Sequence, residues 1–299
     1  MFNLSDFDKS DDGKMYLVPI EIIESLKKKF PKPKETISLT FGDCGENHVG
    51  MEKIGSLVKE GNGFNLTDFE KYKSIFEKLG CDTTIYNLNE QLTDFNGKNH
   101  PSEIAYIMVV KNGLEKLLHI NNFTIEDLYK DMDSFEWDHK YFDTRRKKVL
   151  NKHARANVCF GNSSVEPNYE EREGRIVGYD SVSSLKSVKE ELVNKLGSKC
   201  ENMICEGNRY YDLKKCGIGW HGDAERRKVL AFRIGDSMDL RFNWFYKSKS
   251  VGETFSITLN NGDMYMMSEK AVGHDWKKRN SYTLRHSAGM DGSSYLNLR

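Results

Sequence analysis

The chain has 299 residues, of which 38% are hydrophobic and 11% aromatic, and its formal net charge is +0. This composition is typical of a folded protein, and the length allows one large domain or two ordinary ones. A neutral chain has no global basic field to attract nucleic acid, although 30% of its residues are charged and can form local patches. No stretch is long and apolar enough to span a membrane, and the polar N-terminus has no signal core. We therefore expect an intracellular protein, cytoplasmic or nuclear.

The first half of the chain alternates helical and strand-like patterns. Helices are expected at residues 20–29, 51–59, 66–79, 113–118 and 124–132, and strands at 36–41, 83–88 and 104–110. Asn65 or Thr67 is expected to cap the helix at 66–79, and the Pro/Lys segment 30–34 reads as a hinge. This alternation predicts a small α/β region over residues 1–144, whose role the residues do not define.

The pattern changes after an aromatic and basic stretch, and we place a domain boundary between residues 144 and 145. One amphipathic helix is expected at 183–196. Short strands are expected after it, at 202–206, 228–234, 240–245, 254–259, 263–267 and 282–286. Many short strands separated by turns are typical of a sandwich or a barrel. The fold class of the whole chain is therefore predicted to be α+β.

Six cysteines are spread along the chain, at Cys44, Cys81, Cys159, Cys200, Cys205 and Cys216. None forms a C-x-x-C pair, and a chain of this size does not need disulfide staples. We expect reduced thiols and no zinc site built on them.

The sharpest chemical signal is the segment from Trp220 to Asp223, which reads W-H-G-D. On an extended chain, His221 and Asp223 point to the same face, because side chains repeat every second residue. An imidazole and a carboxylate on one face can share a metal ion. With a distant histidine they would complete a two-His-one-carboxylate triad, which leaves positions open for a co-substrate and O2.

The surrounding motifs resemble the AlkB family of 2-oxoglutarate/Fe(II) oxygenases. The resemblance rests on N-R-Y at residues 208–210, on G-I-G-W-H-G-D at 217–223, and on an acidic residue, Glu225, shortly after. Segments 157–161, 230–235, 240–242, 261–268 and 275–276 resemble the family's other core strands in order. The resemblance covers about residue 145 to the C-terminus. It implies a double-stranded β-helix, or jelly roll, with supporting helices, acting as a dioxygenase with Fe(II), 2-oxoglutarate and O2.

By position, the resemblance assigns His221 and Asp223 to iron, and Asn208 and Tyr210 to 2-oxoglutarate. Glu225 and Trp220 would contact the substrate. Arg279 and Arg285 reproduce an arginine element that the family uses on the co-substrate's carboxylates. A guanidinium suits that task because it binds a carboxylate through two hydrogen bonds and stays charged.

The distal metal ligand is where this chain departs from the family, because Lys278 stands at the usual position. Two assignments remain open: His274 as the ligand with Arg285 on the co-substrate, or His286 with Arg299. Arg285 and His286 should not both reach one pocket, since neighbours on a strand face opposite ways. A fold that no longer binds metal and serves as a binding module is a third possibility.

The expected substrates are alkylated nucleic-acid bases, DNA or RNA, which the resemblance favours. Basic residues that fit such a substrate are Arg145, Arg146, Lys147, Lys148, Lys152, Arg155, Arg226, Arg227 and Lys228. Aromatic residues that could stack on bases are Trp137, Tyr141 and Phe142. Each of these is also compatible with ordinary solvated charge or packing, and a protein or small-molecule substrate stays open.

Segment 41–50, F-G-D-C-G-E-N-H-V-G, is dense in Gly, Asp, Glu and His. It could be a substrate-recognition loop. We favour a turn in which Glu46 or Asn47 caps a helix that begins near Met51.

Overall fold

The computed structural model describes residues 7–9, 15–17, 34–92, 101 and 103–289. By its internal contacts the chain divides into two compact units, residues 1–34 and residues 35–299. In the first unit, β1 (Phe7–Lys9) and β2 (Met15–Leu17) form an antiparallel hairpin. The helix expected at 20–29 and most of the hinge at 30–34 lie outside the described residues. The rest of the fold belongs to the second unit.

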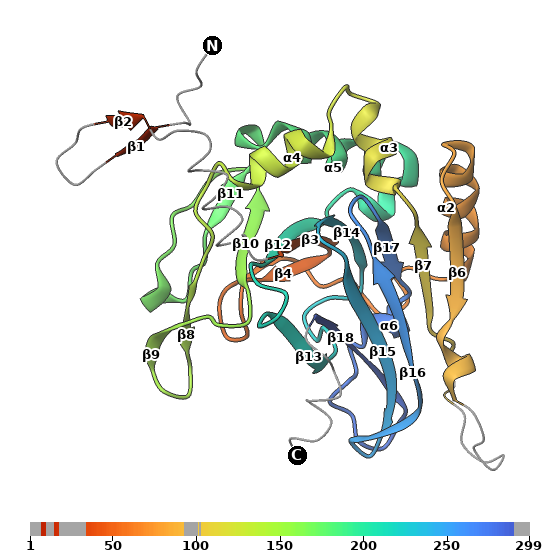
Figure 1. The fold of residues 1–299 in the computed structure, drawn as a ribbon. Helices are drawn as coiled ribbons and strands as arrows, with labels where there is room; N and C mark the ends of the chain where they lie inside the picture. The colour runs from red at the N-terminus through yellow and green to blue at the C-terminus, as the bar shows by residue number, and fades with distance from the viewer. Residues whose placement is uncertain (1–6, 10–14, 18–33, 93–100, 102, 290–299) are drawn as a thin grey trace. The chain divides into compact units, whose positions relative to one another are not determined.

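An eight-stranded mixed sheet forms the centre of the second unit (Figure 1). Its order is β11 (Ile176–Gly178), β10 (Ala156–Gly161), β12 (Ile204–Tyr210), β3 (Thr36–Gly42), β14 (Val229–Gly235), β17 (Met264–Met267), β7 (Tyr106–Val110) and β6 (Thr83–Asn87). The β10–β11 pair is parallel, and the remaining neighbours run antiparallel.

A second, antiparallel sheet has four strands. Its order is β13 (Gly217–His221), β18 (Thr283–Gly289), β15 (Met238–Tyr246) and β16 (Lys249–Leu259). Two separate hairpins complete the strands, β4 (Cys44–Glu46) with β5 (Lys53–Gly55), and β8 (Lys140–Asp143) with β9 (Lys148–Asn151). The helices are α2 (Leu66–Lys78), α3 (Gly113–His119), α4 (Ile125–Met132), α5 (Ser183–Leu196) and α6 (Glu269–Val272).

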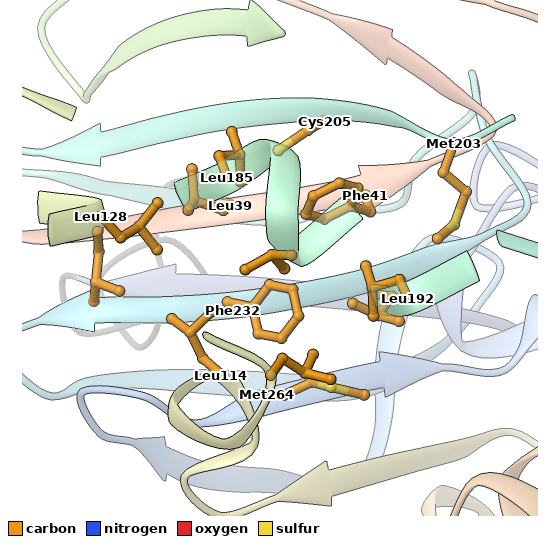
Figure 2. Packing of buried hydrophobic residues seen from close by; sticks show 14 of the residues in the cluster. Leu39, Phe41, Leu114, Leu128, Leu185, Leu192, Met203, Cys205, Phe232 and Met264 are labelled. Carbon is orange, nitrogen blue, oxygen red and sulfur yellow. The ribbon is translucent and has the colours of Figure 1, made fainter. Parts of the chain in front are cut away.

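Side chains of β14 alternate between two separate cores, as the period of a strand requires. Leu230, Phe232 and Ile234 belong to the core that the large sheet shares with α2, α3, α4 and α5. Figure 2 shows Phe232 in this core, with Leu114 of α3, Leu128 of α4, and Leu185 and Leu192 of α5. Val229 and Ala231 belong to the other core, together with apolar residues of the four-stranded sheet. The large sheet is therefore a middle layer between helices and the small sheet.

The predicted α+β class is confirmed. The two sheets stack as layers, and in the described part of the chain they do not close into a barrel. The helix predicted at 183–196 matches α5, and Asn65 caps α2 through a capping box with Asp68. The strand expected at 202–206 extends further, to Tyr210.

The helix predicted at 51–59 is wrong. Residues 53–55 form β5, which pairs with β4. Gly50 and Gly55 both have a φ of +92°, outside the helical region, so no helix can run through this segment. Asn47 consequently caps no helix, and its side chain donates to Asp138 instead.

The boundary predicted at 144/145 does not coincide with the division of the structure, which lies between residues 34 and 35. Strand β3, from the first half of the chain, lies between β12 and β14 of the second half. Strands β6 and β7 extend the same sheet beyond β17. The first half therefore supplies part of the sheet that the motifs of the second half need.

All six cysteines are buried free thiols. No helix in the described ranges is long and apolar enough to cross a membrane.

Substituting Phe232 would measure how much the helix-covered face of the large sheet contributes to the free energy of unfolding. Its ring is fully buried and meets Phe41 edge-on, at 6.0 Å between centroids. We expect Phe232→Ala to lower the free energy of unfolding by about 3–5 kcal/mol in urea titrations, because it leaves a cavity. Phe142→Ala, on the half-buried face of β8, should cost clearly less; equal losses would contradict this account of the core.

Candidate metal centre

The pairing of β13 with β18 brings two histidines together. His221 and His286 are Cα partners across the two strands, after a bulge between Ile218 and His221. Directly opposed side chains of paired strands lie on the same face. Asp223 follows two residues after His221, so one strand end and its neighbour supply all three side chains.

The three side chains converge on one point. The Nε2 atoms of His221 and His286 each lie 3.4 Å from Oδ1 of Asp223. One ligand atom from each residue lies within 4.8 Å of the others, and these three are the group of metal-ligating side chains found among the described residues. Ligands bound to one ion at roughly 2.1 Å stand about 3 Å apart when adjacent, so this spacing fits a single metal.

The tautomer of His221 follows from its contact with the backbone. Its Nδ1 lies 2.8 Å from the carbonyl oxygen of Gly219, and a carbonyl can only accept. Nδ1 therefore donates to this carbonyl, and Nε2 is the nitrogen that faces Asp223. This orientation, with the outer nitrogen bonded to the protein, is usual for a metal-bound histidine.

Charge and burial also shift the pKa values of Asp223 and His286, the other two residues of the triad. Burial of the Asp223 carboxyl alone would raise its pKa, but His286, Arg226 and the hydrogen bond from His221 hold that pKa well below its usual value. Burial and the neighbouring His221 lower the pKa of His286. At neutral pH these trends favour an ionised carboxylate and a neutral imidazole, which are the forms that bind metal.

Gly222, between the two ligands of the motif, is required by packing. A Cβ at this position would lie 2.2 Å from the carbonyl oxygen of Gly273 and 2.7 Å from Cβ of Trp276. The backbone N–H of Asp223 also donates to the carbonyl of Val272, at 3.0 Å. The end of α6 and the segment after it therefore pack directly against the H-G-D motif.

The triad lines a cavity of about 170 Å³ between the two sheets. Other side chains on its wall are Ser38, Glu46, His48, Arg155, Glu206, Asn208, Tyr210, Glu225, Arg226, Arg233, Tyr265 and Trp276. The cavity is therefore rich in charge, although it lies next to an apolar core.

Arg233 is the most unusual residue of this wall. It lies on the same face of β14 as Val229 and Ala231, so its side chain points into the space between the sheets, where it is 1% exposed. Its guanidinium lies 5.9 Å from the ring of Tyr210 and 5.8 Å from that of Tyr265. Its Nε and Nη1 atoms have no hydrogen-bond partner among the residues that the structure describes. Burying an unpaired charge is costly, so a guanidinium in this position is suited to an anionic ligand.

Several predicted residues lie where the sequence placed them. Asn208, Tyr210 and Glu225 line the cavity with the triad. Burial and the nearby Asp223 raise the pKa of Glu225. Trp220 lies beside Phe245, at 6.2 Å between ring centroids, while Trp276 takes a place on the cavity wall.

The structure also separates the competing assignments. His286 joins the triad, whereas His274 lines a different, larger cavity of about 860 Å³ together with Lys277 and Lys278. Arg285 faces away from the triad, with its guanidinium 4.1 Å from the ring of Phe245 and 5.2 Å from that of Trp276. Arg279 is exposed, and Arg299 lies outside the described residues.

Segment 41–50 contributes directly to the cavity. Glu46, His48 and Val49 line it, and Val49 is 81% exposed. The loop is anchored through Asn47, whose side chain donates to Asp138 and whose carbonyl accepts from Lys152. The strand-to-helix turn favoured from the sequence is therefore wrong, and the segment lies at the edge of the cavity instead.

The basic and aromatic residues expected to meet nucleic acid divide into two groups. Arg145, Arg146, Lys147 and Lys148 form the exposed turn of the β8–β9 hairpin, and Tyr141 stacks on His48 at 3.7 Å between ring centroids. The buried residues are not available for stacking or for phosphate contacts: Trp137, Lys152 and Arg226. Arg227 pairs with Glu269, and Lys228 donates to the carbonyl of Lys199.

Comparison with known proteins finds similarity to a mimivirus protein. No family model matches it. The chain is 44% identical over 258 residues to "Uncharacterized protein R156" of Acanthamoeba polyphaga mimivirus, a match that covers 86% of this chain and 97% of the mimivirus protein. The chain belongs to the family of that protein. The two are similar over almost the whole length of the mimivirus protein, so the match includes both sheets rather than the H-x-D motif alone.

Sequence reasoning missed Arg233, Arg226 and Glu206 as parts of the site. Arg233 did carry a signal, because a single arginine interrupts the apolar run from Val229 to Ile234. A charge inside such a strand is either paired or reserved for a ligand. Glu206 and Arg226 gave no comparable signal, since their pairing depends on two strands that are far apart in the chain.

His48 makes the stability of the metal-free protein depend on pH. Burial lowers its pKa to about 4, from about 6.5 in an unfolded chain, so the unfolded state binds the proton first. Stability is therefore lost as the pH falls from about 6.5 to 4. His48→Phe keeps a ring against Tyr141 but cannot be protonated, so its melting temperature should fall less over this range. If the melting temperatures of the wild type and His48→Phe fall equally between these pH values, this assignment is contradicted.

Proposed function

We propose that this protein is an Fe(II)- and 2-oxoglutarate-dependent dioxygenase. The observation that carries the proposal is that a triad of His221, Asp223 and His286 shares one small cavity with Arg233. Two imidazoles and a carboxylate on one face of an ion are the ligand set of non-haem Fe(II) oxygenases. A guanidinium with unpaired N–H groups supplies the site for the carboxylate of a 2-oxo acid.

The residues present fit both groups. His221, Asp223 and His286 would hold the iron, and Arg233 would hold the distal carboxylate of 2-oxoglutarate beside Tyr210. Iron and 2-oxoglutarate, when bound with O2, would supply the oxidation of a substrate C–H bond. The protein's own part is to orient these groups in a cavity of about 170 Å³ and to limit the access of water.

Asn208 acts from the wall of the cavity. Its Oδ1 accepts from Nε of Arg155 at 2.7 Å and also from Asn157, and its Nδ2 donates to Glu206 at 3.1 Å. One amide N–H is left, and it is the group with which Asn208 would reach a bound co-substrate.

For the substrate we propose an alkylated nucleic-acid base, so that oxidation at the alkyl carbon removes the group. Three observations support this choice: the resemblance of residues 145–299 to AlkB oxygenases, the stacked pair of His48 and Tyr141 at the cavity, and the exposed basic turn at residues 145–148. Aromatic rings and cations near an active site are the usual means of holding a base and its phosphates.

The metal centre is tested by spectroscopy without oxygen. Apoprotein mixed with Fe(II) and 2-oxoglutarate should develop a visible metal-to-ligand charge-transfer band. We expect His221→Ala and His286→Ala to lose this band, because each removes one ligand. His274→Ala should retain it. A band that survives His286→Ala, or no band in the wild type, would contradict the proposed centre.

The role of Arg233 is tested by titrating 2-oxoglutarate into the Fe(II) protein. We expect Arg233→Gln to weaken its binding roughly 10- to 100-fold, the usual effect of losing a charge-assisted hydrogen bond of about 1.5–3 kcal/mol. Fe(II) binding should remain. Arg285→Gln, whose guanidinium lies against Phe245 and Trp276, is the matched control and should bind 2-oxoglutarate normally. If Arg285→Gln weakens 2-oxoglutarate binding and Arg233→Gln does not, the arginine that binds the co-substrate is Arg285.

A further inference from the structure

Arg226 is a buried cation beside the metal triad, and it is surrounded by carboxylates. It is 4% exposed. Its Nη2 donates to Oε2 of Glu206 at 2.6 Å and to Oε1 of Glu225 at 3.0 Å. Its Nε lies 3.7 Å from Oδ2 of Asp223. One guanidinium therefore balances three carboxylates, of which Asp223 alone belongs to the triad.

The two oxygens of Asp223 consequently face different partners. Oδ1 faces the imidazoles of His221 and His286, at 3.4 Å from each Nε2 atom. Oδ2 faces Arg226. A metal held by both histidines would meet Oδ1 first, while Oδ2 would remain engaged by the cation.

The position of Arg226 is determined by both sheets. Glu206 belongs to β12 of the large sheet, whereas Asp223 follows β13 of the small sheet. Gly42 of β3 leaves the space that Arg226 occupies, because a Cβ there would lie 3.1 Å from Cδ of Arg226 and 2.7 Å from the carbonyl oxygen of Lys228. The pairing with Glu206 thus holds the guanidinium at a fixed place next to Asp223.

We propose that Arg226, held by Glu206, is a positioning residue that reserves Oδ2 of Asp223, so that this carboxylate binds the metal through Oδ1 alone. The inference rests on the metal centre proposed above. Its consequence concerns the co-substrate, because a carboxylate bound through both oxygens would occupy a position that 2-oxoglutarate or O2 requires. Arg226 also keeps Glu225 and Glu206, two other carboxylates of the cavity, paired and away from the metal.

Co(II) is a suitable probe, because it binds the same ligand set and its visible spectrum reports on coordination. The full chain would be titrated with Co(II) as wild type, Arg226→Gln, Arg226→Lys and Arg227→Gln. We expect Arg226→Gln to alter the visible spectrum of bound Co(II), because Oδ2 of Asp223 loses its partner and can approach the metal, and to change the Co(II) affinity about tenfold or more, as changes behind a metal ligand commonly do. Arg227→Gln is the matched control, since its guanidinium pairs with Glu269 at 2.8 Å outside the metal cavity, and it should change neither property.

Two further variants separate positioning from folding. Arg226→Gln leaves Glu206 buried without its partner, whereas the double variant Arg226→Gln/Glu206→Gln removes both charges and should fold. Arg226→Lys keeps a cation for Glu206 but cannot reach three carboxylates with a planar fork. Both should melt close to the wild type and still show the altered Co(II) spectrum and the changed Co(II) affinity.

The outcomes distinguish this inference from the proposed function. If folded Arg226 variants bind Co(II) with wild-type affinity and spectrum, Arg226 does not position Asp223, and the metal centre still stands. If the wild type fails to bind Co(II), or His221→Ala binds it equally well, the metal centre itself is wrong and the inference fails with it.

Discussion

Backbone pairing between β13 and β18 sets His221 opposite His286, and the chemistry of the site depends on this register. A shift of one residue would turn the face of β18 and bring Arg285 to the triad in place of the histidine. Strand β15 limits such a shift, because it pairs with the other edge of β18 and aligns Phe242 with His286. His286 of the candidate triad is therefore placed by a central strand that has partners on both sides.

The two buried arginines of the cavity differ in whether their charge is paired within the protein. Arg226 is paired with carboxylates from both sheets, so its charge is satisfied within the protein. Arg233 lies between the rings of Tyr210 and Tyr265, with two nitrogen atoms that bond to nothing in the described structure. The first is suited to maintaining the shape of the site and the second to receiving an anion. A negatively charged occupant of the cavity would balance the unpaired charge of Arg233.

Local signals predicted those features of the fold that depend on neighbouring residues. The α5 helix was predicted to the residue because its apolar spacing is regular, and the cap of α2 followed from Asn65. The helix at 51–59 failed because glycines with positive φ override its apolar pattern. No local pattern reveals that β3 pairs with strands that come far later in the chain, on the other side of the boundary placed at 144/145.

The site shows the same division. His221 and Asp223 could be predicted, since two residues on an extended chain share a face. The choice between His274 and His286 could not be made from the sequence, because it depends on which strand pairs with β13. Arg226 was expected to contact nucleic acid, and its pairing with Glu206 could not be predicted, because that contact depends on tertiary packing that sequence spacing does not reveal.

The place of β3 has a consequence for how the chain folds. Leu39 pairs with Gly207 on one side and with Phe232 on the other, so β3 must wait for strands made much later during synthesis. Closing such long loops costs chain entropy before any contact stabilises them, and topologies rich in distant contacts fold slowly. Until β12 and β14 emerge, β3 has no neighbour in the sheet. Before that point β6 and β7 can pair with each other, but both edges of β3 lack partners. During synthesis this early strand therefore depends on β12 and β14 to cover its edges and to prevent pairing with other molecules.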